Sequence, residues 1–152
     1  MVFDLKIEEQ KAQPMLCIRM KTSMEKLPAA IGEGYTRIMK YLEELGVQAQ
    51  YAPYTAYYNL DMNDLDVEMG FPVGEIFPDK DGIKAGQIPP GKVVSCLYKG
   101  AYAEMEEPYK EIMKWIEESG HVPTGVYYEY YFNSPQEVPE SELLTRIVIP
   151  LK

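Results

Sequence analysis

The sequence contains little of what several common functional sites require. It has two cysteines, Cys17 and Cys96, and one histidine, His121, among 152 residues. A catalytic triad would have to use His121, which follows a helix end and has no marked nucleophile or orienting partner. Because no Cys or His pair occurs at ligand spacing and no glycine-rich loop follows a strand, we expect neither a metal site nor a nucleotide or other cofactor.

Long apolar runs and basic clusters are also absent. No run approaches the roughly 18 residues that span a bilayer, and the first ten residues are acidic where a signal peptide would be basic and then apolar. The net charge is −9, so an anionic membrane or a phosphate backbone would repel the protein. We therefore expect a cytoplasmic protein without direct nucleic-acid or membrane binding, in which both cysteines are buried thiols rather than a disulfide.

The sequence contains an internal repeat. Aligning residue n with n + 74 sets 35–46 against 109–120 with seven identities, and three more follow at Tyr54/Tyr128, Tyr57/Tyr131 and Asn59/Asn133, which gives ten in 25 positions. We interpret the chain as one domain made of repeat one, about 14–73, a linker, 74–91, and repeat two, about 92–151.

Each repeat reads as strand, helix, strand, strand. The helices carry apolar stripes at helical spacing, Pro28 suits the first turn of the earlier helix, and Gly46 and Gly120 supply the stops. Trp115, near the second stripe, is interpreted as a core residue in preference to a ligand-stacking one. The strands are expected at Met15–Lys21, Tyr54–Leu60, Leu65–Val73, Lys92–Lys99, Val126–Asn133 and Leu143–Leu151, with a further short strand at Phe3–Glu8 and no element in Gly74–Gly91.

The predicted fold class is α+β, a pseudo-twofold duplication of this unit. Pairing the strands of both repeats into one antiparallel sheet would bury both helical stripes on one face of that sheet. A groove on the pseudo-axis would then be the natural place for a small ligand.

The strand Val126–Asn133 carries the most distinctive side chains. Its period of two places Tyr127, Glu129 and Tyr131 on one face, so that a carboxylate lies between two phenol rings. If that face lines a cavity, a partly dehydrated Glu129 attracts a cation, as ring faces also do, or acts as a base. The alternative is a solvated strand face in which Tyr and Glu simply alternate.

Several motifs resemble those of the GyrI-like small-molecule-binding domains, which also serve as effector domains of AraC-type and MerR-type regulators. They are the repeated unit itself, the segment Lys99-Gly-Ala-Tyr102, and the closing segment with Tyr128-Glu-Tyr, Asn133-Ser-Pro and Pro139-Glu-Ser-Glu-Leu-Leu-Thr-Arg-Ile-Val-Ile-Pro150. The resemblance implies an aromatic groove with one acidic residue that takes lipophilic, often cationic compounds. Glu129 matches the acidic position, and Tyr127, Tyr131, Tyr57 and Tyr102 are expected beside it.

Three functions remain open at this point. The first is a stand-alone protein that binds or sequesters lipophilic, preferentially cationic or aromatic compounds. By resemblance to some family members, the second is a hydrolase of cyclopropane-containing electrophiles that uses Glu129 as general base. The third, again by resemblance, is an acidic protein that inhibits a basic partner such as a topoisomerase, or that acts with a regulator. No helix-turn-helix accompanies the motifs, which argues against direct promoter binding.

Overall fold

A computed structural model describes residues 4–48 and 51–152 and divides the chain into two compact units. Residues 1–10 and 91–152 form the first unit, and residues 11–90 form the second. The chain therefore enters the first unit, completes the second, and returns. Each unit is described by itself below.

The second unit contains the first predicted repeat. Its elements are β2 (Gln13–Thr22), α1 (Leu27–Leu45), β3 (Tyr54–Tyr57), β4 (Leu65–Pro72) and β5 (Lys84–Ile88). The four strands pair antiparallel in the order β3-β4-β2-β5, and α1 packs on β4 and β2. As the sequence predicts, Pro28 lies in the first turn of α1, and Gly46 ends the helix in a left-handed conformation with φ 71°.

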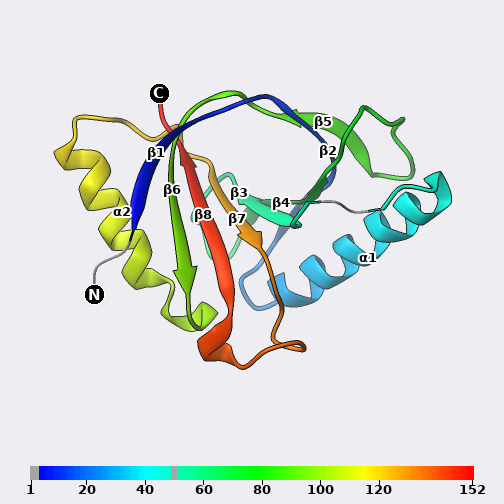
Figure 1. Ribbon diagram of the computed structural model, residues 1–152. Helices are drawn as coiled ribbons and strands as arrows, with labels where there is room; N and C mark the ends of the chain where they lie inside the picture. Colours follow the sequence, from blue (N-terminus) through cyan, green and yellow to red (C-terminus); the bar gives the residue numbers. More distant parts are fainter. Residues whose placement is uncertain (1–3, 49–50) are drawn as a thin grey trace. The chain divides into compact units, whose positions relative to one another are not determined.

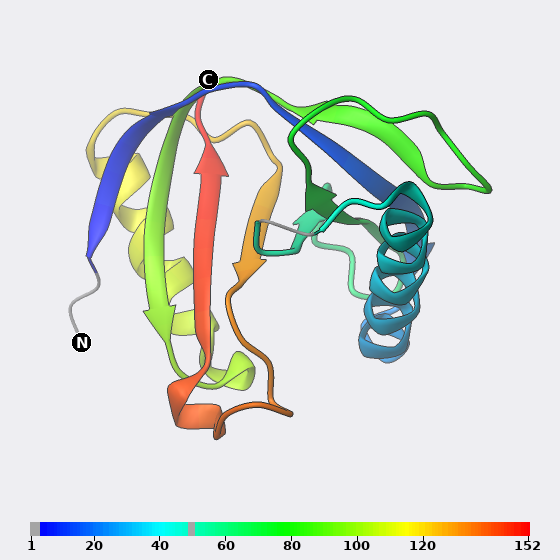
Figure 2. The same ribbon diagram turned by 45° about the vertical axis from the view of Figure 1, so that its right-hand side comes forward.

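The first unit contains the second predicted repeat. Its elements are β1 (Leu5–Gln10), β6 (Gly91–Lys99), the 3₁₀ turn η1 (Tyr102–Glu104), α2 (Glu106–Glu118), β7 (Tyr127–Tyr131), the 3₁₀ turn η2 (Glu140–Glu142) and β8 (Leu144–Pro150). The strands pair antiparallel in the order β1-β6-β8-β7. Helix α2 runs along one face of these strands (Figure 1 and Figure 2), where Ile112 and Ile116 pack on Ile147.

Each unit thus has the predicted order of strand, helix, strand and strand, and the α+β class is confirmed. The observed strands differ from the expected ranges mainly at their ends. The duplication as such, the sharing of one sheet, the placing of both helices on one face of it and the groove on the pseudo-axis stay predictions. The expected strand Phe3–Glu8 is observed as Leu5–Gln10, and Phe3 lies outside the described residues.

Strand β5 corrects the expectation that residues 74–91 form no element. It pairs with β2, whereas β1 pairs with β6, so the strand before each repeat joins the first strand of the other repeat. An apolar period is missing from β5 because Gly86 faces Met15, where even a Cβ would come within 2.9 Å of the Met15 methyl group. Ile88 is the one buried residue of this strand, so its side chains carry little signal.

The apolar stripes predicted for the two helices pack into the hydrophobic cores of their units. In the second unit Ile38 and Leu42 of α1 pack on Val67 and Met69 of β4, and all four are buried. Cys17 and Cys96 are buried free thiols, and burial raises the pKa of Cys96 to about 11. Trp115 packs against the core of the first unit, and its ring stacks on His121 with centroids 6.4 Å apart.

Candidate functional site around Glu129

Glu129 lies in the middle of β7 and points to the side of the sheet that α2 covers. Its partner across the antiparallel pair is Ile147, which belongs to the core beneath α2. Side chains alternate along a strand, so Tyr127 and Tyr131 share this side, whereas Tyr128 and Tyr130 point to the other. Tyr128 and Tyr130 are themselves stacked, with ring centroids 6.4 Å apart.

Two phenol groups hold the carboxylate of Glu129. The hydroxyl of Tyr131 donates to Oε1 at 2.7 Å, and the hydroxyl of Tyr109 donates to Oε2 at 2.5 Å. Tyr131 comes from the same strand, whereas Tyr109 comes from α2, so the carboxylate connects the helix to the sheet. Charge-assisted hydrogen bonds of this kind are about twice as strong as neutral ones, which fixes the orientation of the carboxylate.

Sequence reasoning did not place Tyr109 in the site. Its position in the apolar stripe of the second helix assigned it to the core, and its ring does pack there. The available signal was the identity of Tyr35 and Tyr109 in the repeat alignment. A tyrosine kept at the same stripe position in both repeats suggests that its hydroxyl has a partner, because a purely apolar position has no need of one.

Further tyrosine rings border the two that bind the carboxylate. Tyr102, in the turn before α2, meets Tyr131 edge to face at 5.8 Å, and Tyr127 meets Tyr109 edge to face at 6.4 Å. Tyr102 is 40% exposed, so solvent reaches this end of the cluster. Glu129 and these four tyrosines, which we call the Glu129 cluster, all belong to the first unit.

Burial dominates the electrostatics of Glu129. Loss of hydration raises the pKa of its carboxyl group, and the hydrogen bonds from Tyr109 and Tyr131 oppose this rise only in part. No Lys or Arg in residues 4–48 or 51–152 forms an ion pair with Glu129. The pKa of the Tyr102 hydroxyl is raised as well, first by burial and then by the charge of Glu129. The cluster is therefore a half-buried acidic site without a cationic partner.

Thr145 adds a polar group behind the cluster. It pairs with Tyr131 across β7 and β8, and its side chain is fully buried. Its Oγ1 has no hydrogen-bond partner within the part of the chain that the structure describes. An unpaired buried hydroxyl of this kind costs free energy.

Tyr57, the remaining sequence-predicted site residue, lies in the second unit. It ends β3 and packs, partly buried, against the core beneath α1. Its part in a site with Glu129 stays a prediction.

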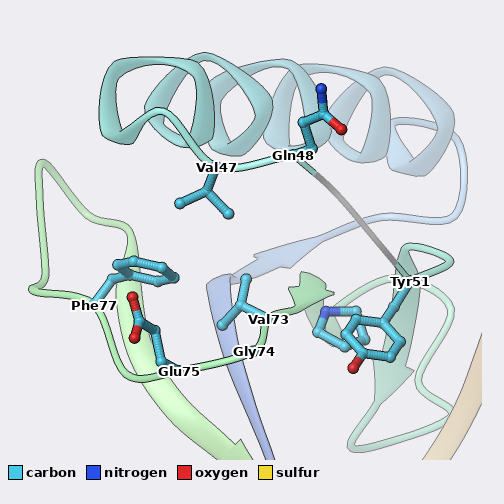
Figure 3. Close-up of a pocket in the computed structure, with 8 residues that line it drawn as sticks. Val47, Gln48, Tyr51, Val73, Gly74, Glu75 and Phe77 are labelled. Carbon is cyan, nitrogen blue, oxygen red and sulfur yellow. The ribbon is translucent and has the colours of Figure 1, made fainter.

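A separate cavity of about 260 Å³ lies in the second unit, near the end of α1. In Figure 3, Val47 extends toward Val73 and Phe77, and Tyr51 lies to one side. The carboxylate at this cavity, Glu75, is exposed to water. The cavity therefore lacks the dehydrated, phenol-bound carboxylate that distinguishes the Glu129 cluster.

Neither a metal-binding cluster nor a membrane-spanning helix occurs in residues 4–48 and 51–152. No group of three or more His, Cys, Asp or Glu side chains there is placed to hold a metal ion. Among the helices of those residues, none is long and apolar enough to cross a membrane.

Comparison with known proteins places the chain among small-molecule-binding domains. A family model described as GyrI-like small molecule binding domain matches residues 3–152. No curated protein sequence matches the chain.

Solved structures show the same fold at low sequence identity. The EcmrR C-terminal domain matches with a TM-score of 0.77 and 20% identity, over 100% of this chain and 99% of that one. EcmrR in a complex with DNA matches with a TM-score of 0.85 and 19% identity. This match spans 99% of this chain and 57% of the EcmrR chain. SAV2435 bound to tetraphenylphosphonium matches with a TM-score of 0.65 and 11% identity, over 98% of this chain and 94% of that one.

Proposed function

Because the chain belongs to the GyrI-like small-molecule-binding domains, we propose that it binds or sequesters lipophilic, preferentially cationic or aromatic compounds at the Glu129 cluster. The observation that carries the proposal is the phenol-bound carboxylate of Glu129, which is half-buried and has no basic partner among the described residues. A lipophilic cation would supply the missing positive charge, and the rings of Tyr102 and Tyr127 would attract it through their faces.

The similar structures support this class of ligand without assigning it. One is the complex of SAV2435 with tetraphenylphosphonium, a lipophilic cation, and another is the C-terminal domain of EcmrR. The chain spans 57% of the EcmrR chain in the DNA complex, so a role beside a regulator is a further proposal and concerns a larger assembly. We retain Tyr57 as a proposed fifth tyrosine of the site.

Calorimetric titration with tetraphenylphosphonium and with tetraphenylborate, an anion of the same size, tests the proposal. The wild-type protein should bind the cation and not the anion. Glu129→Gln keeps the shape of the side chain and removes its charge, so it should weaken cation binding by about ten- to a hundredfold. Glu118→Gln removes the same charge from the exposed end of α2 and should change little. Equal affinity for both ions would exclude the role of Glu129.

Hydrolysis of a neutral strained electrophile is the second candidate, and the raised pKa of Glu129 favours it. A carboxylate with a raised pKa is a stronger base, and the hydroxyl of Tyr102 could donate a hydrogen bond to the leaving group. A hydrolase from Listeria innocua shares the fold, with a TM-score of 0.71 at 13% identity over 97% of this chain and 91% of that one. Turnover of a cyclopropane-containing electrophile should fall by roughly 10²–10⁴ in Glu129→Gln. Absence of turnover by the wild-type protein would leave binding alone.

A further inference from the structure

Strand β1 lies at one end of the strand order β1-β6-β8-β7 in the first unit (Figure 2). It pairs with β6 on one side, and no strand of residues 4–48 or 51–152 pairs with its other side, which we call the outer edge of β1. Every second residue of an antiparallel strand turns its backbone N–H and C=O away from the neighbouring strand. No loop or side chain of the described chain bonds to the backbone of Leu5–Glu9, so these outward groups can accept another strand.

The second unit also ends in a strand, β5, but that strand is partly protected by its own loop. The backbone N–H of Ala85 donates to Oδ1 of Asp79 at 2.7 Å, so the preceding loop uses a backbone donor of β5. Proteins commonly protect end strands, because a row of unpaired backbone groups is a template for another chain. The two end strands therefore differ in how readily they can accept a partner.

The side chains of β1 are complementary to a second copy of the same strand. When two β1 strands pair antiparallel about Ile7, Ile7 lies opposite Ile7 of the partner subunit, and Lys6 lies opposite Glu8 of the partner subunit. Directly opposite side chains are about 4.5–5.5 Å apart at Cβ, so opposite charges attract, and symmetry gives this ion pair twice. Pairing centred on Lys6 or on Glu8 would instead place like charges opposite each other. The sequence of β1 thus favours one register.

The residues that would meet are accessible in the single chain. Ile7 is 41% exposed, which is unusual for an aliphatic side chain on an unpaired strand edge. Among the described residues, Lys6 makes only a loose ion pair, with Asp4 at 3.9 Å. Glu8 accepts a hydrogen bond from Arg146 at 2.6 Å and stays partly exposed, and a carboxylate can accept further hydrogen bonds from a second cation.

We propose that the outer edge of β1 is an interface at which two copies of this chain pair antiparallel about Ile7. The contact joins the first units of both copies through backbone hydrogen bonds, the apolar contact of Ile7 and two ion pairs. It is independent of the proposed function, because no residue of the Glu129 cluster belongs to β1. One strand pair buries far less than the roughly 1,200–2,000 Å² of a standard interface, so the dimer is weak and depends on protein concentration.

Sedimentation velocity of the full chain, from low micromolar to millimolar concentration, tests the proposal. The wild-type protein should change from monomer to dimer over this range. Lys6→Glu would place two negative pairs across the interface, and Glu8→Lys would place two positive pairs. Each variant alone should therefore weaken dimerisation by roughly ten- to a hundredfold.

An equimolar mixture of Lys6→Glu and Glu8→Lys gives the decisive measurement. In the mixed dimer every charge at these two positions lies opposite a charge of the other sign, so association should return to the wild-type level. The matched control is Lys84→Glu, which makes the same change of charge on β5 and should leave dimerisation unchanged. If Glu8→Lys folds poorly after losing its bond to Arg146, Ile7→Lys replaces it, because like charges at this exposed position should also prevent pairing.

Three results would overturn the proposal. The first is a wild-type protein that stays monomeric at millimolar concentration, including one that pairs with an unrelated extended peptide instead. The second is a dimer that Lys6→Glu leaves intact, or that Lys84→Glu weakens to the same extent. The third is a failure of the two folded variants, Lys6→Glu and Glu8→Lys, to associate when mixed, because charge pairing about Ile7 would then not hold the copies together.

Discussion

The two units place the same tyrosines around different central residues. In the first unit Tyr109 of the helix donates to Glu129, and in the second unit the aligned Tyr35 bonds to Oγ1 of Thr55 at 3.0 Å. Thr55 is fully buried, whereas Glu129 is only half-buried. The same helix-to-sheet hydrogen bond therefore completes a core in one unit and holds a charged group near solvent in the other.

Helix packing contributes to this difference. Gly34 of α1 lies so close to Met69 that a Cβ at this position would come within 2.9 Å of the Met69 methyl group. The aligned residue in the other repeat is Pro108, in the first turn of the shorter helix α2. Close approach of α1 covers this part of the sheet, where Thr55 is fully buried.

A carboxylate held by tyrosines is also not sufficient for a binding site. Glu68 of β4 accepts hydrogen bonds from Tyr54 at 2.7 Å and from Tyr58 at 3.2 Å, on the side of the sheet away from α1. It is only 5% exposed. Glu129 and Glu68 thus share their phenol donors, but Glu68 is buried and lies near Arg19, whose guanidinium stacks 3.7 Å above the ring of Tyr58.

Substitution of Thr55 by Glu, which would give the second unit the central residue of the first, should have the largest effect on stability. It would bring a charge into a fully buried position, and we expect the free energy of unfolding to fall by about 3–5 kcal/mol at neutral pH. Thr55→Gln, which has the same size without the charge, separates overpacking from ionisation. Urea denaturation measures both. A stable Thr55→Glu protein that binds a second equivalent of tetraphenylphosphonium would show that the units are interchangeable.

Removal of Glu68 should have the next largest effect. Glu68→Ala takes away the acceptor of two hydroxyl groups, one of them in a buried pair, and should lower the free energy of unfolding by about 2–4 kcal/mol. Its effect on cation binding should be small compared with that of Glu129→Gln. If Glu68→Ala instead abolished binding while leaving stability unchanged, the assignment of a structural role to Glu68 would be wrong.

The smallest expected effect is the contribution of Glu129 to the pH dependence of folding stability. Its pKa is raised in the folded protein, so between the ordinary glutamate value and the raised value the folded state binds more protons than the unfolded state. Stability should therefore fall as pH rises through this window, and Glu129→Gln should melt above the wild type at neutral pH. The difference should vanish in acid, where both side chains are neutral.

The pH dependence of cation affinity provides an independent measurement of the ionisation of Glu129. Only the ionised carboxylate attracts a cation, so affinity for tetraphenylphosphonium should decrease as pH falls through the raised pKa of Glu129. Affinity that stays constant down to the ordinary range of glutamate would contradict the burial of this group.

Local sequence patterns determined much of the fold. Alternation along β7 predicted that Tyr127, Glu129 and Tyr131 share a side, and Gly46 ends α1 as expected. The aligned asparagines illustrate how far the repeat extends. Asn59 bonds to Asp64 and Asp66, and Asn133 bonds in the same way to Glu142 and Leu144, so each clamps the loop between its two strands. These features depend on residues near one another in the chain.

Tertiary structure alone decided which carboxylate is buried, what holds it and which strand is added. Tyr109 reaches Glu129 from 20 residues away, and the helical stripe that places Tyr109 is also compatible with simple core packing. Strand β5 exists because β2 offers it backbone partners, which no side-chain period records. Sequence periodicity specifies the face on which a residue lies, whereas burial and hydrogen bonding depend on what the chain brings against that face.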